Sequence, residues 1–381
     1  MSVNTRKQVL AKLQRKYVKA GRGFRRELID QAVQLLGYKQ RKAAIRALNR
    51  EPFLAGAIKT GRPRDYDPEK LLPALKAIWL ASQQPCSFRL AAAMADWVPA
   101  YEEHHRKLAA DTSLGLLEAS PRTLDRLLKP LRAQYRKPRG GTKPGTLLRK
   151  QIPIRAGTWD EATAGYLEVD TVALCGGSLE GSFVWMVDGE DICTTWVETR
   201  AMWNRGETGT LEQIKDIEAS LPFTLLGLDS DNGGEFINYH LKRYLDLKQA
   251  KFTRSRPYRK NDNAHIEQKN YTHVRQWFGY ERYDNPEVVG LINELARGPL
   301  RQLRNYFLPS MKLLEKVRDQ TRTIRRYGAA QTPFARVMDS EQVLASKKEE
   351  LKRERERLNP FILNAQVERG LKEIYRARSL G

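Results

Sequence analysis

The sequence predicts a multidomain chain with all-α helix-turn-helix units at the N-terminus, a central α/β core and a mostly helical C-terminal region. Three observations predict this order. The chain has 381 residues, which is more than one ordinary domain holds. Apolar residues recur at helical spacing as far as about residue 136, and apolar runs of strand length begin near residue 165. We expect a helix-turn-helix domain at 1–50, a linker at 51–67, a second helical domain at 68–136, a basic linker at 137–158, the core at 159–285 and a basic C-terminal region at 286–381.

Charge is concentrated at the N-terminus. The formal net charge is +22, and residues 1–64 hold 17 Lys or Arg against three acids. Such an excess predicts a polyanionic partner, either nucleic acid or an anionic membrane surface. No apolar stretch has the length of a membrane span, and the first residues lack the apolar segment of a signal peptide. We therefore expect a cytoplasmic, nucleoid-associated protein without membrane partners.

The first 50 residues show the pattern of three helices, near 5–19, 24–36 and 39–49. Gly21-Arg22-Gly23 and Gly37-Tyr38 separate them. The third helix would turn its apolar residues inward and its cations outward, as a helix that lies in a major groove does. The alternative is a plain three-helix bundle with a solvated basic face. The DNA contacts expected on this helix are Lys39, Arg41, Lys42 and Arg46.

Two further segments carry cations suited to DNA. Arg62 and Arg64 form a short basic arm that could enter a minor groove, although a solvated linker explains them equally well. In the second helical domain, Pro68 begins one helix and Ser120 caps another at Pro121–Tyr135. That last helix resembles a second recognition helix. The contacts expected on it are Arg122 and Arg126.

The central region alternates strands and helices. We expect strands at 166–173, 182–187, 194–199, 223–228 and 251–253, and helices at 208–219, 236–247 and 263–278. Further on, residues 312–318 and 322–327 fit a small hairpin or two helical turns, and the pattern does not decide between them. A solvated helix at 346–357 and an amphipathic helix at 358–378 complete the chain. The thiols of Cys86, Cys175 and Cys193 are too widely spaced for a zinc pair, and we expect them to be buried.

Three acids could form a two-metal site. Asp170 lies in the middle of an apolar strand, where a carboxylate is costly unless it is paired or metal-bound. Asp231 follows a buried strand, and Glu267 lies in the first turn of a helix. Phosphoryl transfer by two Mg²⁺ ions needs such carboxylates to converge from separate elements.

These acids lie in runs that resemble bacterial insertion-sequence transposases with an integrase-type core, members of the retroviral-integrase superfamily. The runs are 168–172 (EVDTV), 231–236 (DNGGEF) and 253–270 (TRSRPYRKNDNAHIEQKN). The resemblance implies a ribonuclease-H-like core with a Mg²⁺-dependent catalytic triad of Asp170, Asp231 and Glu267, in which Mn²⁺ substitutes. It also implies a homo-oligomer on double-stranded DNA that binds the element's terminal inverted repeats, cleaves the DNA and joins it to a target. Retroviral integrases carry a His/Cys zinc module, but His104-His105 has no matching Cys pair, so we expect no zinc.

Several alternatives accompany this assignment. Asp229 lies two residues before Asp231 and could share its face. We favour Asp231 as the second acid, because it stands directly before Asn-Gly and has the expected spacing to Glu267. Glu168 could support the site from the strand of Asp170, and Asp188 and Asp191 fit a solvated turn. The cations expected to contact phosphates near the site are Arg254, Arg256, Lys260, Lys269 and Arg275. We expect Trp277 and Phe278 in the core, and His265 and His273 in structural or DNA-facing positions. The competing function is a transposase-derived DNA-binding regulator with an inactive core, and a general nuclease is a third possibility.

Overall fold

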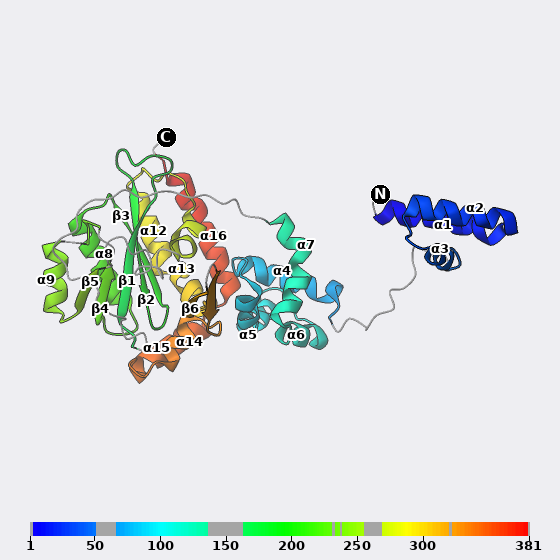
Figure 1. Ribbon diagram of the computed structural model, residues 1–381. Coiled ribbons are helices and arrows are strands. Elements are labelled where there is room, and N and C mark those ends of the chain that lie inside the picture. Colours follow the sequence, from blue (N-terminus) through cyan, green and yellow to red (C-terminus); the bar gives the residue numbers. More distant parts are fainter. Residues whose placement is uncertain are drawn as a thin grey trace. The chain divides into compact units, whose positions relative to one another are not determined.

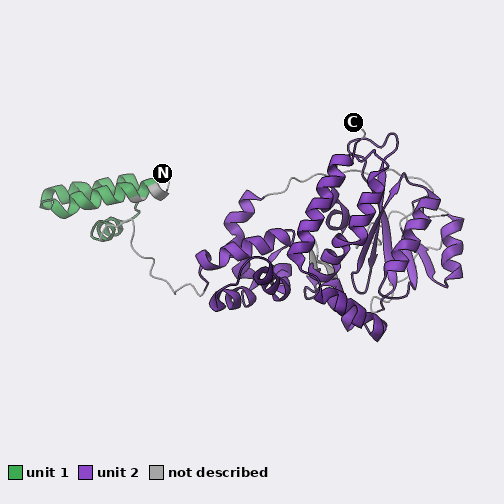
Figure 2. Ribbon diagram, turned by 180° about the vertical axis from the view of Figure 1, so that it is seen from behind, with its two compact units in different colours: residues 1–65 green, residues 66–381 purple. Residues whose placement is uncertain are grey.

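The computed structural model describes residues 3–50, 66–135, 163–230, 233–236, 238–254, 269–319 and 322–379. The chain divides into two compact units, Met1–Asp65 and Tyr66–Gly381 (Figure 2). Arg62, Arg64, Asp231, Arg256, Lys260, His265 and Glu267 lie outside the described residues.

The first unit consists of three helices around its own apolar core. They are α1 (Val3–Lys19), α2 (Arg22–Leu36) and α3 (Arg41–Leu48). Gly37 ends α2 in the left-handed region at φ 63°, and its N–H donates to the carbonyl of Val33. The side-chain amide of Gln14 on α1 donates to the carbonyls of Ala47 and Arg50, at 2.8 and 3.0 Å. These two bonds satisfy carbonyls at the end of α3 and fix that helix against α1.

The second unit begins with four helices, α4 (Pro68–Ala81), α5 (Ser87–His104), α6 (Ala110–Leu117) and α7 (Pro121–Gln134). The Ser120 hydroxyl accepts from the N–H of Thr123 at 3.2 Å, which confirms the expected cap of α7. Trp97 on α5 is fully buried, and its indole N–H donates to the carbonyl of Phe307 at 3.0 Å. These helices therefore share a core with the C-terminal part of the chain.

A five-stranded sheet forms the centre of the second unit (Figure 1). Its strands are β1 (Tyr166–Ala173), β2 (Val184–Asp191), β3 (Val197–Trp203), β4 (Gly227–Ser230) and β5 (Lys251–Arg254), in the order β3-β2-β1-β4-β5. The first three strands form an antiparallel meander, and β4 and β5 continue from β1 in parallel. Helix α8 (Glu207–Ser220) connects β3 to β4, and α9 (Tyr239–Leu247) connects β4 to β5. The mixed α/β core expected from the sequence is confirmed.

The C-terminal region is mostly helical, as expected. It follows η1 (Tyr271–Arg275, a π-helix) and α11 (Gln276–Phe278), which lie within the range expected for the core. Its own elements are α12 (Val288–Arg297), α13 (Pro299–Gln302), η2 (Leu303–Phe307, a π-helix), β6 (Leu313–Asp319), β7 (Arg322–Tyr327), α14 (Pro333–Asp339), α15 (Ala345–Glu356) and α16 (Pro360–Ala377). Strands β6 and β7 pair antiparallel, so the hairpin interpretation of this segment is confirmed. Within the described ranges, we find no helix whose length and apolar character would let it cross a membrane.

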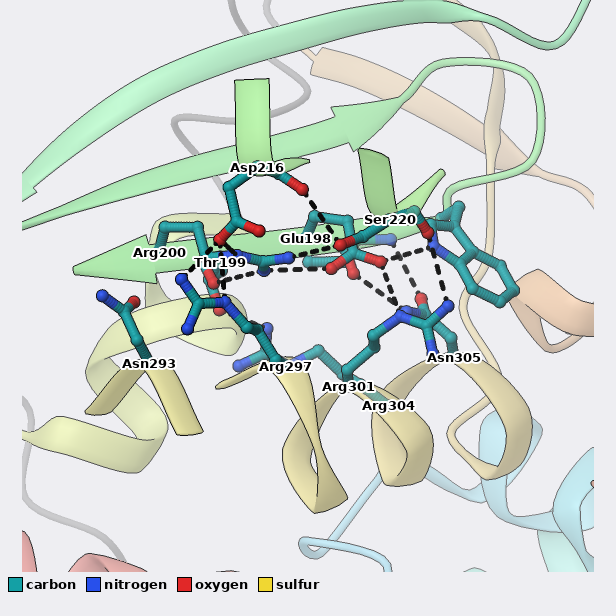
Figure 3. A network of polar contacts seen from close by, with 12 residues as sticks. Glu198, Thr199, Arg200, Asp216, Ser220, Asn293, Arg297, Arg301, Arg304 and Asn305 are labelled. Carbon is teal, nitrogen blue, oxygen red and sulfur yellow. Dashed lines mark hydrogen bonds and ion pairs between the residues drawn. The ribbon is translucent and has the colours of Figure 1, made fainter. Parts of the chain in front are cut away.

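Two asparagines cover the edge of the central sheet that β3 forms. At strand β3, the Asn293 amide accepts from the N–H of Ala201 at 2.7 Å and donates to its carbonyl at 2.9 Å. Asn305 makes the same pair of bonds to Val197, each at 2.9 Å (Figure 3). An edge strand otherwise presents unpaired backbone groups to other chains. Here α12 and η2 satisfy those groups and are held against the sheet.

A buried ion network joins the same strand to α8. Arg200 on β3 is fully buried and donates to Asp216 at 2.6 Å, to Glu198 at 3.1 Å and to Ser220 at 2.7 Å (Figure 3). From α13, Arg301 donates to Glu198 at 2.8 Å. Because each buried charge has a close partner of opposite sign, the network can lie inside the protein.

Candidate active site

One face of the central sheet carries five carboxylates. The register places Asp170 of β1 opposite Asp188 of β2, and Glu168 opposite Glu190. On the other side of β1, Glu168 is paired with Asp229 of β4. Residues that lie opposite one another share a face of the sheet. Four of the five acids are buried, and Asp170 is partly exposed.

The segment that follows Glu267 in the sequence supplies polar partners to this face. Lys269 forms an ion pair with Glu190. Asn270 donates from Nδ2 to Asp170 Oδ2 at 2.6 Å, and His273 Nδ1 lies 3.0 Å from a carboxylate oxygen of Asp188. These residues are spaced i, i+1 and i+4, so together they fix this segment on the acidic face. His273 is buried, in keeping with the structural position expected for it.

Arg304 adds a buried positive charge behind His273. Its Nη2 donates to the carbonyl of His273 at 2.5 Å, and its Nη1 donates to the hydroxyl of Thr199 at 3.3 Å. Burial lowers the pKa of the guanidinium to about 10, while the nearby carboxylates of Asp188 and Glu198 act in the opposite direction. Arg304 therefore stays cationic at neutral pH and offsets part of the negative charge of the acidic face. The sequence analysis did not identify this residue.

The Asp170 carboxylate accepts hydrogen bonds from two neighbouring residues. Its Oδ1 accepts from the N–H of Thr171 at 2.7 Å, and its Oδ2 accepts from Asn270. The buried Oδ1 of Asn270 has no hydrogen-bond partner among the described residues. Mg²⁺ prefers carboxylate and amide oxygens. Asp170 and Asn270 offer oxygens of this kind, but the described residues contain no group of three or more His, Cys, Asp or Glu side chains that could hold a metal ion.

A buried glutamate ties the segment after β4 to the strand of Asp170. Glu235 is 4% exposed, and its Oε1 accepts from the Thr171 hydroxyl at 2.7 Å. Its Oε2 lies 3.4 Å from Nε of Arg205, whose guanidinium stacks on Trp185. The sequence analysis missed this role. The one sequence feature that could have indicated this role is the position of Glu235 next to the apolar Phe236, which the structure shows to be fully buried.

Asp229, the alternative to Asp231 in the triad, makes a contact that stabilises the sheet. It is 1% exposed, and its Oδ1 accepts from the hydroxyl of Thr253 on β5 at 2.5 Å. The bond joins β4 to β5 at the register that pairs these two residues. Ser230, the last residue of β4, is paired with Val169, the residue before Asp170.

The expectation of a solvated turn at Asp188 and Asp191 is wrong, because both residues are fully buried. Strand β2 continues to Asp191 instead of ending at residue 187. The Asp191 carboxylate accepts from the N–H of Gly165 at 2.7 Å, and from the N–H and hydroxyl of Thr194 at 2.6 Å each. Burial raises the pKa of this carboxyl to about 6. The expectation of buried thiols is confirmed for Cys175 and wrong for Cys86, which is exposed, and Cys193 is half-buried.

The structure separates the cations expected to contact DNA into two groups. The exposed ones are Lys39, Arg41, Lys42, Arg46, Arg122 and Arg126. Near the site, Arg254 is buried, Lys269 is paired with Glu190, and Arg275 donates to the carbonyl of Ala173 at 2.6 Å. Trp277 and Phe278 are buried in the core, as expected.

Comparison with known proteins gives one relative in sequence and several in structure. No protein-family model matches the chain. The chain is 34% identical over 342 residues to the uncharacterized protein y4rM of Sinorhizobium fredii (strain NBRC 101917 / NGR234), a match that covers 88% of this chain and 96% of that protein. The catalytic core domain of BIV integrase is similar at 12% identity and a TM-score of 0.30, over 47% of this chain and 97% of that one. The catalytic core domain of HTLV-2 integrase, in a dimeric form with magnesium, is similar at 11% identity and a TM-score of 0.28, over 38% of this chain and 88% of that one.

Proposed function

We propose that this chain, which belongs to the same family as the uncharacterized protein y4rM of Sinorhizobium fredii, is a DNA transposase. It would bind the terminal inverted repeats of an insertion sequence, cleave the DNA and transfer the freed 3′ end to a target. Asp170, Asp231 and Glu267 would form its catalytic triad. The proposal is supported by the motifs that contain these three residues and by the surroundings of Asp170.

The observation that carries the proposal is the hydrogen bond from Asn270 to Asp170. Asn270 follows Glu267 by three positions in the sequence, and this contact supports the proposal that Glu267 and Asp170 act together. The pairing of Ser230 with Val169 supports the same proposal for the second acid, because Asp231 and Asp170 are the residues that follow these two in the sequence. Three acids that are 61 and 36 positions apart in the sequence would thus share one site.

The three carboxylates would hold Mg²⁺, or Mn²⁺ in its place. The metal supplies charge stabilisation for the phosphoryl group under transfer. Neighbouring residues would hold the carboxylates in position. Asn270 orients the Asp170 carboxylate, and Glu235 accepts a hydrogen bond from Thr171 on the same strand. His273 and Lys269 hold the segment after Glu267 on the acidic face through Asp188 and Glu190.

The helical N-terminal parts would read the DNA. Helix α3 has exposed cations at Lys42 and Arg46, besides Arg41, which is paired with Asp30, and α7 has Arg122 and Arg126 exposed. Arg62 and Arg64, which lie between these two helices in the sequence, would contact the minor groove. Two element ends must be joined in one reaction, so we propose at least a dimer on DNA. Size measurement of the complex with terminal-repeat DNA would give more than one copy of the chain, and a monomeric active species would contradict this.

A labelled terminal-repeat duplex tests the activity. The parent chain should nick it in Mn²⁺, and Glu267→Gln should nick it at least 10²–10³ times more slowly, about the value of one lost electrostatic contact to a transition state. Gel-shift binding should survive the substitution, because Gln keeps the size of the side chain. A parent chain that binds the duplex without nicking it would instead support the DNA-binding regulator.

A further inference from the structure

Arg205 lies at the edge of the central sheet where the strand of Asp170 ends. Strands β1, β4 and β5 run parallel, and β3 runs the same way because β3 and β1 both pair antiparallel with β2. These four strands therefore end at one edge of the sheet. Asp170 lies near the end of β1, and Arg205 follows the last residue of β3 by two positions. Open α/β sheets bind their ligands at this edge, outside the carboxyl ends of the strands.

Two contacts hold the Arg205 side chain in place. The carbon at the centre of its guanidinium lies 4.7 Å from the centre of the Trp185 ring. Its Nε lies 3.4 Å from Oε2 of Glu235, whose side chain is 1% exposed. Glu235 in turn accepts the hydroxyl hydrogen bond of Thr171, the residue after Asp170. An aromatic ring and a buried carboxylate thus fix the guanidinium close to the strand of Asp170.

Most of the hydrogen-bonding capacity of Arg205 remains available to a ligand. A guanidinium has five N–H donors in a planar fork. The ion pair with Glu235 engages Nε, and within the described part of the chain Nη1 and Nη2 of Arg205 donate to no other residue. The side chain is 45% exposed. Four N–H groups on a fixed, solvent-accessible fork are suited to an anion with two or more oxygens, such as a phosphate.

The cations that the sequence suggested near the site are engaged within the protein instead. Arg254 is buried, Lys269 forms an ion pair on the acidic face, and Arg275 donates to a backbone carbonyl at 2.6 Å. Arg205 differs from all three, because its exposed fraction and its remaining donors leave it accessible from outside. A polyanion that reached the edge of the sheet beside Asp170 could therefore contact Arg205.

We propose that Arg205 binds a phosphate group of the DNA at the candidate active site. Choosing DNA as the source of the phosphate rests on the proposed function. Contacts of Arg to phosphates fix the position of a protein on DNA without reading its sequence. Because Trp185 and Glu235 already hold the guanidinium, little side-chain freedom is lost when the phosphate binds. Arg205 would thus place a DNA strand next to Asp170.

The salt dependence of binding tests this proposal with a variant that keeps the net charge. Arg205→Gln/Glu235→Gln removes one cation together with its partner, so no buried carboxylate is left unpaired. The full chain is titrated against a fluorescent terminal-repeat duplex at several salt concentrations, in chelator so that no cleavage occurs. One lost phosphate contact should make the slope of log affinity against log salt shallower by about 0.9. If parent and variant bind equally at 1 M salt, the variant should bind roughly eightfold more weakly at 0.1 M.

A second ion pair of the same construction provides the control. Lys248 is 49% exposed, lies 2.9 Å from Glu218 and packs on the Tyr244 ring at 5.6 Å. Glu218 lies near the end of α8, and Lys248 follows α9, so this pair lies toward the opposite edge of the sheet, where β4 and β5 begin. Lys248→Gln/Glu218→Gln should therefore keep the parent slope.

The outcomes separate the assignment of Arg205 from the proposed function. Circular dichroism and thermal melts check that the variants fold alike, and Arg205→Gln alone should show the same change of slope as the double variant. A parent slope in Arg205→Gln/Glu235→Gln would mean that Arg205 only neutralises Glu235. That result, or an equal loss in the control pair, would overturn the phosphate contact while leaving the proposed function intact. A parent chain without affinity for duplex DNA would overturn both.

Discussion

Replacing Asn305 by Leu should destabilise the second unit strongly. Asn305 is fully buried, and its amide satisfies both the N–H and the carbonyl of Val197 at 2.9 Å. Leucine has nearly the same size but no polar atoms, so two backbone groups would lose their partners in the interior. Each buried group left unsatisfied costs about 1–3 kcal/mol. The free energy of unfolding should therefore fall by about 2–6 kcal/mol.

Denaturant titration followed by tryptophan fluorescence measures this change. Trp196 is fully buried next to Val197, so it reports on this edge of the sheet. Asn293→Leu should behave similarly, because Asn293 makes the same pair of bonds to Ala201. Glu349→Leu is the control, since it places the same side chain at an exposed position of α15. An Asn305→Leu chain that unfolds at the denaturant concentration of the parent would refute the role of these bonds.

Three further predictions concern the site, the fold and the first unit. Asn270→Ala removes a hydrogen bond to a carboxylate, worth about 1.5–3 kcal/mol, so nicking should slow roughly 10- to 100-fold while gel-shift binding is kept; an unchanged rate would count against the positioning role. Burial raises the pKa of Asp191 from 3.8 to about 6, so its contribution to stability is complete below pH 3.8 and is lost as the pH rises through 6. The free energy of unfolding of the parent, relative to Asp191→Asn, should fall between pH 4 and pH 6.5 in denaturant titrations, and a rise over that range would contradict this. Residues 1–65 alone should bind duplex DNA with an affinity that falls steeply with salt, and a flat response in a salt titration would exclude binding through phosphates.

Periodicity predicted the elements that have one apolar face. Helix α7 is an example, with Ser120 as its cap and a buried stripe of leucines. By contrast, the analysis assigned no helix to the span of α5. Pro99 lies inside that helix, where proline removes a backbone donor, but Pro130 lies inside α7 in the same way, so an internal proline does not mark a helix end here. The packing of Trp97 against the C-terminal region stabilises α5 in spite of it.

In the candidate site too, local sequence patterns predicted some features, while others depend on contacts between residues far apart in the sequence. Asp170 could be singled out because a carboxylate in an apolar strand needs a partner. Asp188 and Asp191 fit a solvated turn because they follow the expected end of a strand at residue 187. The burial of residues 188–191 depends on His273, which lies 85 positions further along the chain, and on Lys269. Contacts of that separation leave no trace in local sequence patterns.

The nicking rates of Asp231→Asn and Asp229→Asn test the central claim most directly. Both substitutions remove one negative charge from nearly the same place in the chain, and both keep the size of the side chain. Asp229 is buried and accepts a hydrogen bond from Thr253, so it belongs to the joint between β4 and β5. On a labelled terminal-repeat duplex in Mn²⁺, Asp231→Asn should abolish nicking, and Asp229→Asn should keep much of the parent rate. Full activity in Asp231→Asn, with an inactive Asp229→Asn of parent-like stability, would contradict the triad of Asp170, Asp231 and Glu267.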